Sequence, residues 1–195
     1  MPDPVAKKPA RVRKKAPKKH AEAIGVPVFP VMGLDLSCTG TGIVVVEESG
    51  EIALQAVTGV PLDADSRTRD RTERLVAIAR DVLRVAQARL AKNSSIVIEG
   101  YAFNAKGAQN DLAEVHGVVR VQLHLAGFVN VEYRSVTRAR SRVLGKGWGG
   151  KPKPEVKKEL ALRGRTFRDD NLMDAWVLVA AEVGIATQPP AGEDE

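Results

Sequence analysis

The feature that most constrains the fold of this chain is the order of its apolar segments. Three short, largely apolar segments come first and are separated only by turns, over residues 31–36, 43–47 and 52–57, and the second of them is dense in β-branched residues. Segments of this kind predict an antiparallel meander of three strands. The segments that follow alternate between helical and extended patterns, which is typical of a mixed α/β sheet with flanking helices.

The later segments are assigned by periodicity. Leu75, Ile78 and Val82 recur at helical spacing on one side of a segment whose other side carries arginines. Pro154 suits the first turn of a helix. The pattern predicts helices over residues 72–90, 111–126, 154–164 and 170–186, and two further strands over residues 96–98 and 129–133, which makes five strands in all.

Both ends of the chain differ in composition from the segments between them. Residues 1–20 hold eight lysines and arginines against one aspartate, a net charge of +7, so the other 175 residues sum to −1 of the total +6. A proline-rich, charged segment cannot bury enough apolar surface to offset the entropy of ordering it. The sequence therefore predicts a disordered basic tail over residues 1–27, an ordered domain over residues 28–188 and a disordered acidic tail over residues 189–195.

Composition also bounds the cellular setting. Hydrophobic residues make up 44% of the chain, enough for a sizeable core. No apolar run approaches the roughly 20 residues needed to span a bilayer, and no apolar stretch of the secretory type follows the basic N-terminal segment. The single cysteine, Cys38, excludes an intrachain disulfide and is typical of a reducing compartment. We expect a soluble cytoplasmic protein with no membrane partner.

Three carboxylates stand in segments that the pattern predicts to be buried. Asp35 lies in the first strand, Glu99 ends the fourth, and Asp174 lies in the last helix, with few cationic residues near them in the sequence. Burying a carboxylate without a partner is costly. A divalent cation would offset all three charges, and carboxylate oxygens suit Mg²⁺, with Mn²⁺ as a substitute. One such acid is often a solvated turn residue or a helix cap, but three in this arrangement favour a metal site.

Two further polar residues precede Asp174 by four and three positions. Both spacings put Asp170 and Asn171 on the same side of a helix as Asp174, so either could complete the metal shell. Residues 169–171 are also good N-cap types for a helix that begins here. The sequence leaves capping and ligation open for Asp170.

Four motifs in this order resemble those of the RuvC-type Holliday-junction resolvases, a family with a ribonuclease-H-like fold. Residues 33–42 resemble its opening motif, an Asp-x-Ser followed by Thr-Gly, and residues 98–103 resemble its strand-end Glu followed by an aromatic residue. Residues 112–120 resemble the next helix, and residues 170–175 resemble the closing motif with its Asp-Ala pair. The resemblance covers most of the predicted domain.

The resemblance implies a homodimeric nuclease that binds four-way DNA junctions and nicks two symmetric strands. It implies metal binding and catalysis by Asp35, Glu99 and Asp174. The family often carries an acid or a His three residues before its last Asp, where this chain has Asn171, which can ligate but adds no charge. Asp170 is then a candidate catalytic acid in its place. In a two-metal site Asp35 would bridge both ions, one activating the water and one stabilising the leaving oxygen.

Aromatic residues near the predicted site indicate contacts with an unpaired base. Tyr101 and Phe103 follow Glu99 by two and four residues. An aromatic face stacks on a base without reading its identity, so both are predicted to bind DNA at the branch point. The alternative for Phe103 is a place in the core.

Lysines gather in a glycine-rich segment before the last two predicted helices. Lys146, Lys151 and Lys153 are predicted to contact DNA phosphates, because lysines on such a segment neutralise phosphates without base reading. The alternative is an ordinary solvated loop. Trp148, in the same segment, is predicted to be exposed.

Other functions fit parts of the sequence. The same acids would serve a ribonuclease-H-like nuclease acting on RNA or flapped DNA, or persist in a non-catalytic nucleic-acid-binding protein. A sugar-kinase or actin-like ATPase needs a second glycine-rich phosphate loop and a longer, two-lobed chain. A nucleophilic role for Ser37 or Cys38 is disfavoured, because no His lies near them in the sequence. The sequence favours a Mg²⁺-dependent endodeoxyribonuclease selective for branched DNA.

The charge of the N-terminal tail generates a prediction about DNA affinity. Deleting residues 1–20 removes a net charge of +7 and should weaken binding to all DNA alike. Each phosphate that the tail no longer neutralises should reduce the slope of log K against log salt by about 0.9. A gel-shift titration at several salt concentrations measures this slope, and an unchanged slope would show that the tail does not touch DNA.

Overall fold

One mixed five-stranded sheet forms the centre of the computed structural model, which describes residues 26–59, 70–100 and 109–187. The strands are β1 (Val31–Asp35), β2 (Thr41–Val46), β3 (Ile52–Thr58), β4 (Ile96–Glu99) and β5 (Val131–Arg134). Their order across the sheet is β3-β2-β1-β4-β5. The pairs β1–β2 and β2–β3 are antiparallel, whereas β1–β4 and β4–β5 are parallel. The predicted meander and mixed sheet are confirmed.

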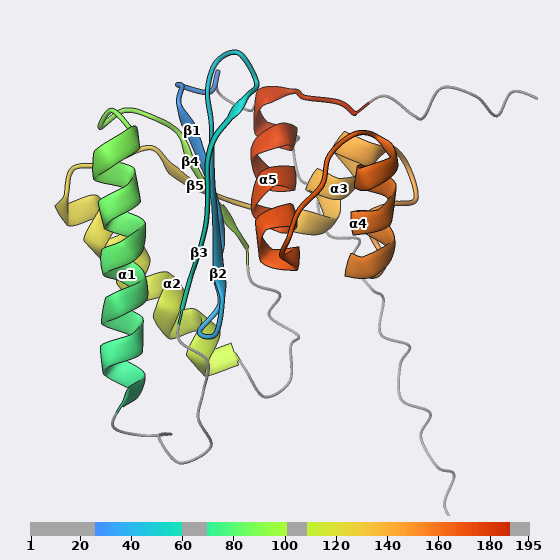
Figure 1. Cartoon of the computed structure of the whole chain (residues 1–195). Coiled ribbons are helices and arrows are strands. Elements are labelled where there is room, and N and C mark those ends of the chain that lie inside the picture. The colour runs from blue at the N-terminus through green and yellow to red at the C-terminus, as the bar shows by residue number, and fades with distance from the viewer. Residues whose placement is uncertain (1–25, 60–69, 101–108, 188–195) are drawn as a thin grey trace, which may run out of the picture.

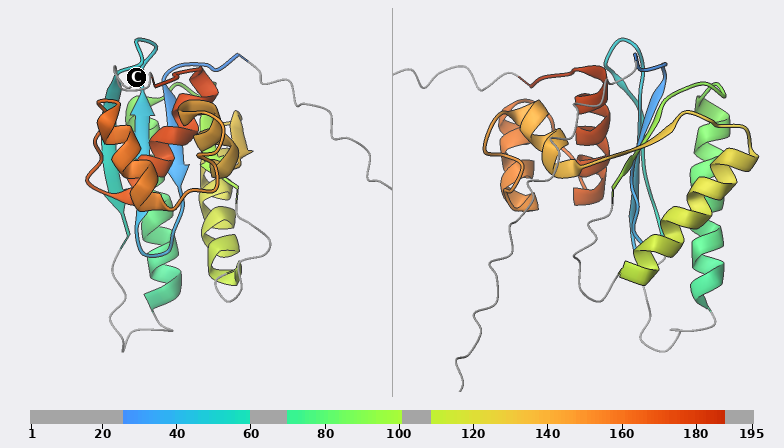
Figure 2. Two further views of the ribbon diagram at one scale, coloured as in Figure 1. Left: turned by 90° about the vertical axis from the view of Figure 1, so that its right-hand side faces the viewer. Right: turned by 180° about the vertical axis from the view of Figure 1, so that it is seen from behind.

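Helices cover both faces of this sheet (Figure 1 and Figure 2). The described helices are α1 (Asp70–Arg89), α2 (Gln109–Leu125), α3 (Val136–Leu144), α4 (Lys153–Leu162) and α5 (Asp170–Val183). α1 and α2 lie on one face, while α5 lies on the other with α3 and α4 outside it. The sequence pattern predicts four of these helices and misses α3, a nine-residue helix with three arginines.

Two apolar cores form because alternate residues of a strand face opposite sides of the sheet. Met32 and Leu34 of β1 pack with α1 and α2, whereas Val31 packs with α5. β4 follows the same rule, with Ile98 in the first core and Val97 in the second. The side of the sheet that a strand residue faces therefore follows from its position in the sequence.

The close approach of α5 to the sheet depends on two glycines. A Cβ atom at Gly33 would overlap the carbonyl oxygen of Ala175 and lie 2.6 Å from Val179 Cγ2. A Cβ atom at Gly42 would lie 2.8 Å from the backbone nitrogen of Leu172. Real Cβ atoms do not approach other atoms so closely, so any side chain at either position would push α5 away from the sheet.

Some predictions concern residues outside the described ranges. Nearly all of the predicted basic tail, all of the acidic tail and the aromatic residues Tyr101 and Phe103 lie there. Among the residues that the structure describes, no helix combines the length and the apolar composition needed to cross a membrane.

The packing of α5 generates a prediction about stability. Gly33→Ala should lower the free energy of unfolding by about 2–3 kcal/mol, because the added methyl group overpacks the contact with α5. Gly117 in α2 is the matched control: a Cβ there meets no atom within 4 Å, so Gly117→Ala should raise the free energy by roughly 0.5–1 kcal/mol. Urea unfolding monitored by circular dichroism measures both, and a neutral Gly33→Ala would contradict the close approach.

Candidate active site

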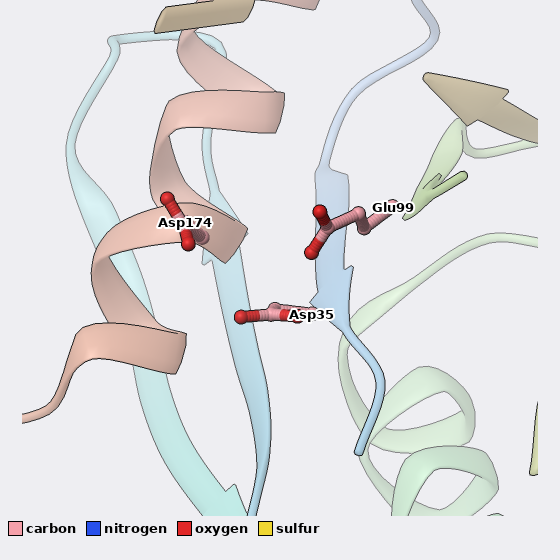
Figure 3. Close-up of side chains that lie close together, drawn as sticks. All are labelled: Asp35, Glu99 and Asp174. Atoms are coloured by element: carbon pink, nitrogen blue, oxygen red, sulfur yellow. The ribbon is translucent and has the colours of Figure 1, made fainter. Parts of the chain in front are cut away.

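Three carboxylates meet where the adjacent parallel strands β1 and β4 end (Figure 3). Asp35 lies on the same face of β1 as Val31, and Glu99 on the same face of β4 as Val97, because side chains alternate along a strand. α5 covers this face and contributes Asp174. One oxygen atom from each of the three side chains lies within 4.8 Å of the other two.

The three acids are largely withdrawn from water. Asp174 is 0% exposed and Asp35 is 5% exposed. Burial raises the pKa of Asp35, and burial together with the hydrogen bond to Asp35 and its charge raises the pKa of Glu99 to about 9. Three oxygen donors gathered at one largely buried place form a set that could hold a divalent cation.

Arg140 of α3 is the main counter-charge of Asp174. Its Nε donates to Asp174 Oδ1 over 3.0 Å, and its Nη2 donates to Oδ1 over 2.7 Å and to Oδ2 over 2.9 Å. Its Nη1 donates to the carbonyl oxygen of Lys151 over 3.1 Å, which ties the segment before α4 to the site. The sequence pattern missed Arg140. A Ser135 N-cap followed by apolar Val136, Ala139 and Val143 at helical spacing was the only signal that could have placed it.

Lys153, the first residue of α4, places its ammonium group among the acids. Its Nζ lies 2.9 Å from Asp174 Oδ2 and 3.3 Å from Asp35 Oδ2, and 3.4 Å from Asn171 Oδ1. Burial lowers the pKa of Lys153, but the charges of Asp35 and Asp174 outweigh it, so the pKa is raised overall. The acids therefore have two cationic partners, both distant in sequence.

The residues before Asp174 have separate roles. Asp169 caps α5, because its side chain accepts hydrogen bonds from the backbone nitrogens of Asn171 and Leu172. Asp170 pairs with Lys157 over 3.2 Å and lies outside the group of three carboxylates. The Asn171 side-chain nitrogen donates to the carbonyl oxygen of Gly40.

The glycine-rich segment before α4 packs against the domain. The prediction that Trp148 is exposed is wrong: it is half-buried and packs against the core that includes α3 and α5. The next residue, Gly149, is buried and lies close to α3, so the segment that carries Trp148 packs against this helix. Lys146 is exposed, and Lys151 pairs with Glu155 over 3.1 Å.

Ser37 and Cys38, for which the sequence disfavours a nucleophilic role, make local contacts. The hydroxyl groups of Ser37 and Thr39 form a hydrogen bond of 3.1 Å. Cys38 is half-buried against the core under α1 and α2, and its Sγ donates to the carbonyl oxygen of Asp111 over 3.4 Å. These contacts account for both side chains without a nucleophilic role.

The sequence matches no known family model and no curated protein, but the structure matches solved ones. RuvC from Thermus thermophilus, crystallised with a Holliday junction substrate, superposes with a TM-score of 0.61 at 22% identity, over 77% of this chain and 90% of RuvC. A second structure of T. thermophilus RuvC gives a TM-score of 0.58 at 24% identity, over 82% and 98% of the two chains. The chain has the ribonuclease-H-like fold of RuvC. The fold and the structural likeness to RuvC predicted from the motifs are therefore confirmed.

The counter-charges of the acids generate a prediction about stability without metal. Asp174→Asn should lower the free energy of unfolding by about 2–3 kcal/mol, because the buried Arg140 loses its counter-charge. Glu99 is a half-buried carboxyl group with a pKa raised to about 9 and a hydrogen bond to Asp35, which a Gln amide can also make, so Glu99→Gln should change the free energy of unfolding by less than about 1 kcal/mol. Urea unfolding in EDTA measures both. Equal losses in the two variants would mean that the Arg140 pair contributes nothing particular to stability.

Proposed function

We propose that the protein is a metal-dependent endonuclease that nicks branched DNA, with the four-way junction as its substrate. The observation that carries this proposal is the group formed by Asp35, Glu99 and Asp174. It lies where the parallel strands β1 and β4 end, in a sheet that resembles that of RuvC. The choice of substrate is supported by RuvC, which shares the fold and is bound to a Holliday junction in one matched structure.

The residues of the site divide the chemistry among them. Asp35, Glu99 and Asp174 would hold Mg²⁺, or Mn²⁺ in its place. Bound there, the metal would supply an activated water and a positive charge for the leaving oxygen of the phosphodiester. Asn171 is a better placed further ligand than Asp170, because its Oδ1 already faces the ammonium group among the acids.

Other predicted DNA contacts are part of the same proposal. Tyr101 and Phe103 follow Glu99 in the chain and would stack on an unpaired base. Lys146 and Lys151 are exposed in the segment between α3 and α4 and would contact phosphates. Lys153 would face a phosphate that lies over the acids.

The proposal includes a homodimer. One chain carries one such acidic group within its described residues, whereas nicking two symmetric strands requires two sites. Val121 and Leu125 of α2 and the nearby Val129 are 55%, 75% and 72% exposed. Exposed apolar side chains that gather in this way are typical of a subunit interface.

The acids should separate cutting from binding. Asp35→Asn, Glu99→Gln and Asp174→Asn should each slow Mg²⁺-dependent cleavage of a four-way junction at least about a hundredfold, since each removes a metal ligand. Each should still bind the junction, because no variant adds a negative charge near the DNA phosphates and the two aspartate variants remove one. Single-turnover cleavage and gel-shift titration measure the two properties. Glu155→Gln is the control, because Glu155 is an exposed acid that pairs with Lys151 and lies outside the group of three acids.

The substrate panel decides among the alternatives. Four-way junction, flap, linear duplex and RNA–DNA hybrid are incubated with and without Mg²⁺. If the protein cuts the flap or the hybrid in preference to the junction, the proposed substrate is wrong while the proposed metal site stands. Binding without cutting by the parent protein would identify a non-catalytic nucleic-acid binder, and undiminished cutting by Asp35→Asn would remove the acids from the chemistry.

A further inference from the structure

The ammonium group of Lys153 occupies a position defined by oxygen atoms. Three residues surround it, Asp35, Asn171 and Asp174, and each presents one oxygen within 3.4 Å of Nζ. All three are residues that the sequence predicts as metal ligands. The Lys153 ammonium group therefore lies at the position that a divalent ion would take if these three oxygens bound it.

The two cations of the site differ in their freedom to move. The side chain of Arg140 is 8% exposed and is held by four hydrogen bonds to Asp174 and Lys151. The side chain of Lys153 is 40% exposed and contacts the acids only through its terminal nitrogen. A lysine ammonium on a flexible four-carbon stem can swing to water, whereas a buried, forked guanidinium cannot leave without unpairing its carboxylate.

We propose that Lys153 is an internal competitor for the metal: its ammonium group holds Asp35 and Asp174 together until a divalent ion displaces it toward solvent. The proposal rests on the proposed function in one respect, that this site takes a metal. Two consequences follow from the charges. The metal-free site is stabilised by Lys153, because Asp35 and Asp174 share its charge. Metal affinity is lowered by Lys153, because entry of the ion breaks two ion pairs and places two cations near one another.

The test compares Lys153→Met with Lys151→Met in the full-length protein. Methionine keeps much of the length of the lysine stem and removes the charge. Lys151 is the matched control, because it lies two residues away and its ammonium group pairs with Glu155 outside the acid group. Mn²⁺ affinity is measured by electron paramagnetic resonance of the free ion, which requires neither DNA nor cleavage.

Lys153→Met should bind Mn²⁺ roughly tenfold more tightly than the parent, or more, since a positive charge about 3 Å from two ligands is gone. Lys151→Met should bind Mn²⁺ as the parent does. Thermal unfolding gives an independent readout: in EDTA the Lys153→Met protein should melt below the parent, and saturating Mn²⁺ should raise its melting temperature by more than it raises that of the parent.

The outcomes separate this inference from the function on which it rests. If the parent binds Mn²⁺ and Lys153→Met binds it equally or less tightly, the competition is refuted while the metal site stands. If neither protein binds Mn²⁺, the metal site and the competition fall together. If Lys151→Met tightens Mn²⁺ binding as much as Lys153→Met does, the effect is one of general surface charge, and the specific role of Lys153 is refuted.

Discussion

The buried charge of Asp174 is the constraint on which the rest of the site depends. Its side chain is fully shielded from water, and a carboxylate in such a place is stable only with a partner of opposite charge and with hydrogen bonds to its oxygens. Arg140 provides both and also fixes the carbonyl group of Lys151. One side chain therefore joins α5, α3 and the segment that leads into α4. The outer helices are held to α5 by this polar contact as well as by the core around Trp176.

The geometry of the acids depends equally on backbone packing. Gly33 lies two residues before Asp35 on the same face of β1, so one strand both admits α5 and presents a carboxylate to it. Gly42 admits the first turn of α5 on the neighbouring strand. Asp174 thus reaches Asp35 because the helix axis is close to the sheet, and the acids are placed by rigid elements, as a preorganised metal site would require.

Local sequence patterns were sufficient to predict most of the fold and to single out the three acids. They did not predict the cationic residues that pair with these acids. The strands and long helices can be recognised from the spacing of their own apolar residues. A carboxylate inside an apolar segment is also a local signal, because the neighbouring residues predict burial and burying a charge is costly. Arg140 has no such signal: it is one of three arginines in a short helix, and the one that turns inward is selected by Asp174, 34 residues later. Lys153 pairs with Asp35 across 118 residues. Trp148 was misplaced for the same reason, because its polar neighbours do not show that the segment packs on α3.

The balance of charge sets this site apart from one built of acids alone. Three acidic side chains face two cations, burial and Asp35 raise the pKa of one of them, Glu99, to about 9, and the residue three positions before Asp174 is the neutral Asn171. The guanidinium of Arg140, which donates three hydrogen bonds to Asp174, offsets part of the charge of that carboxylate. A divalent ion here would meet a smaller net negative charge than three free carboxylates would present, and under the proposed competition its entry would also displace Lys153. The same cations let the acids be buried together before any metal is bound, so the arrangement favours a stable metal-free fold over tight metal binding.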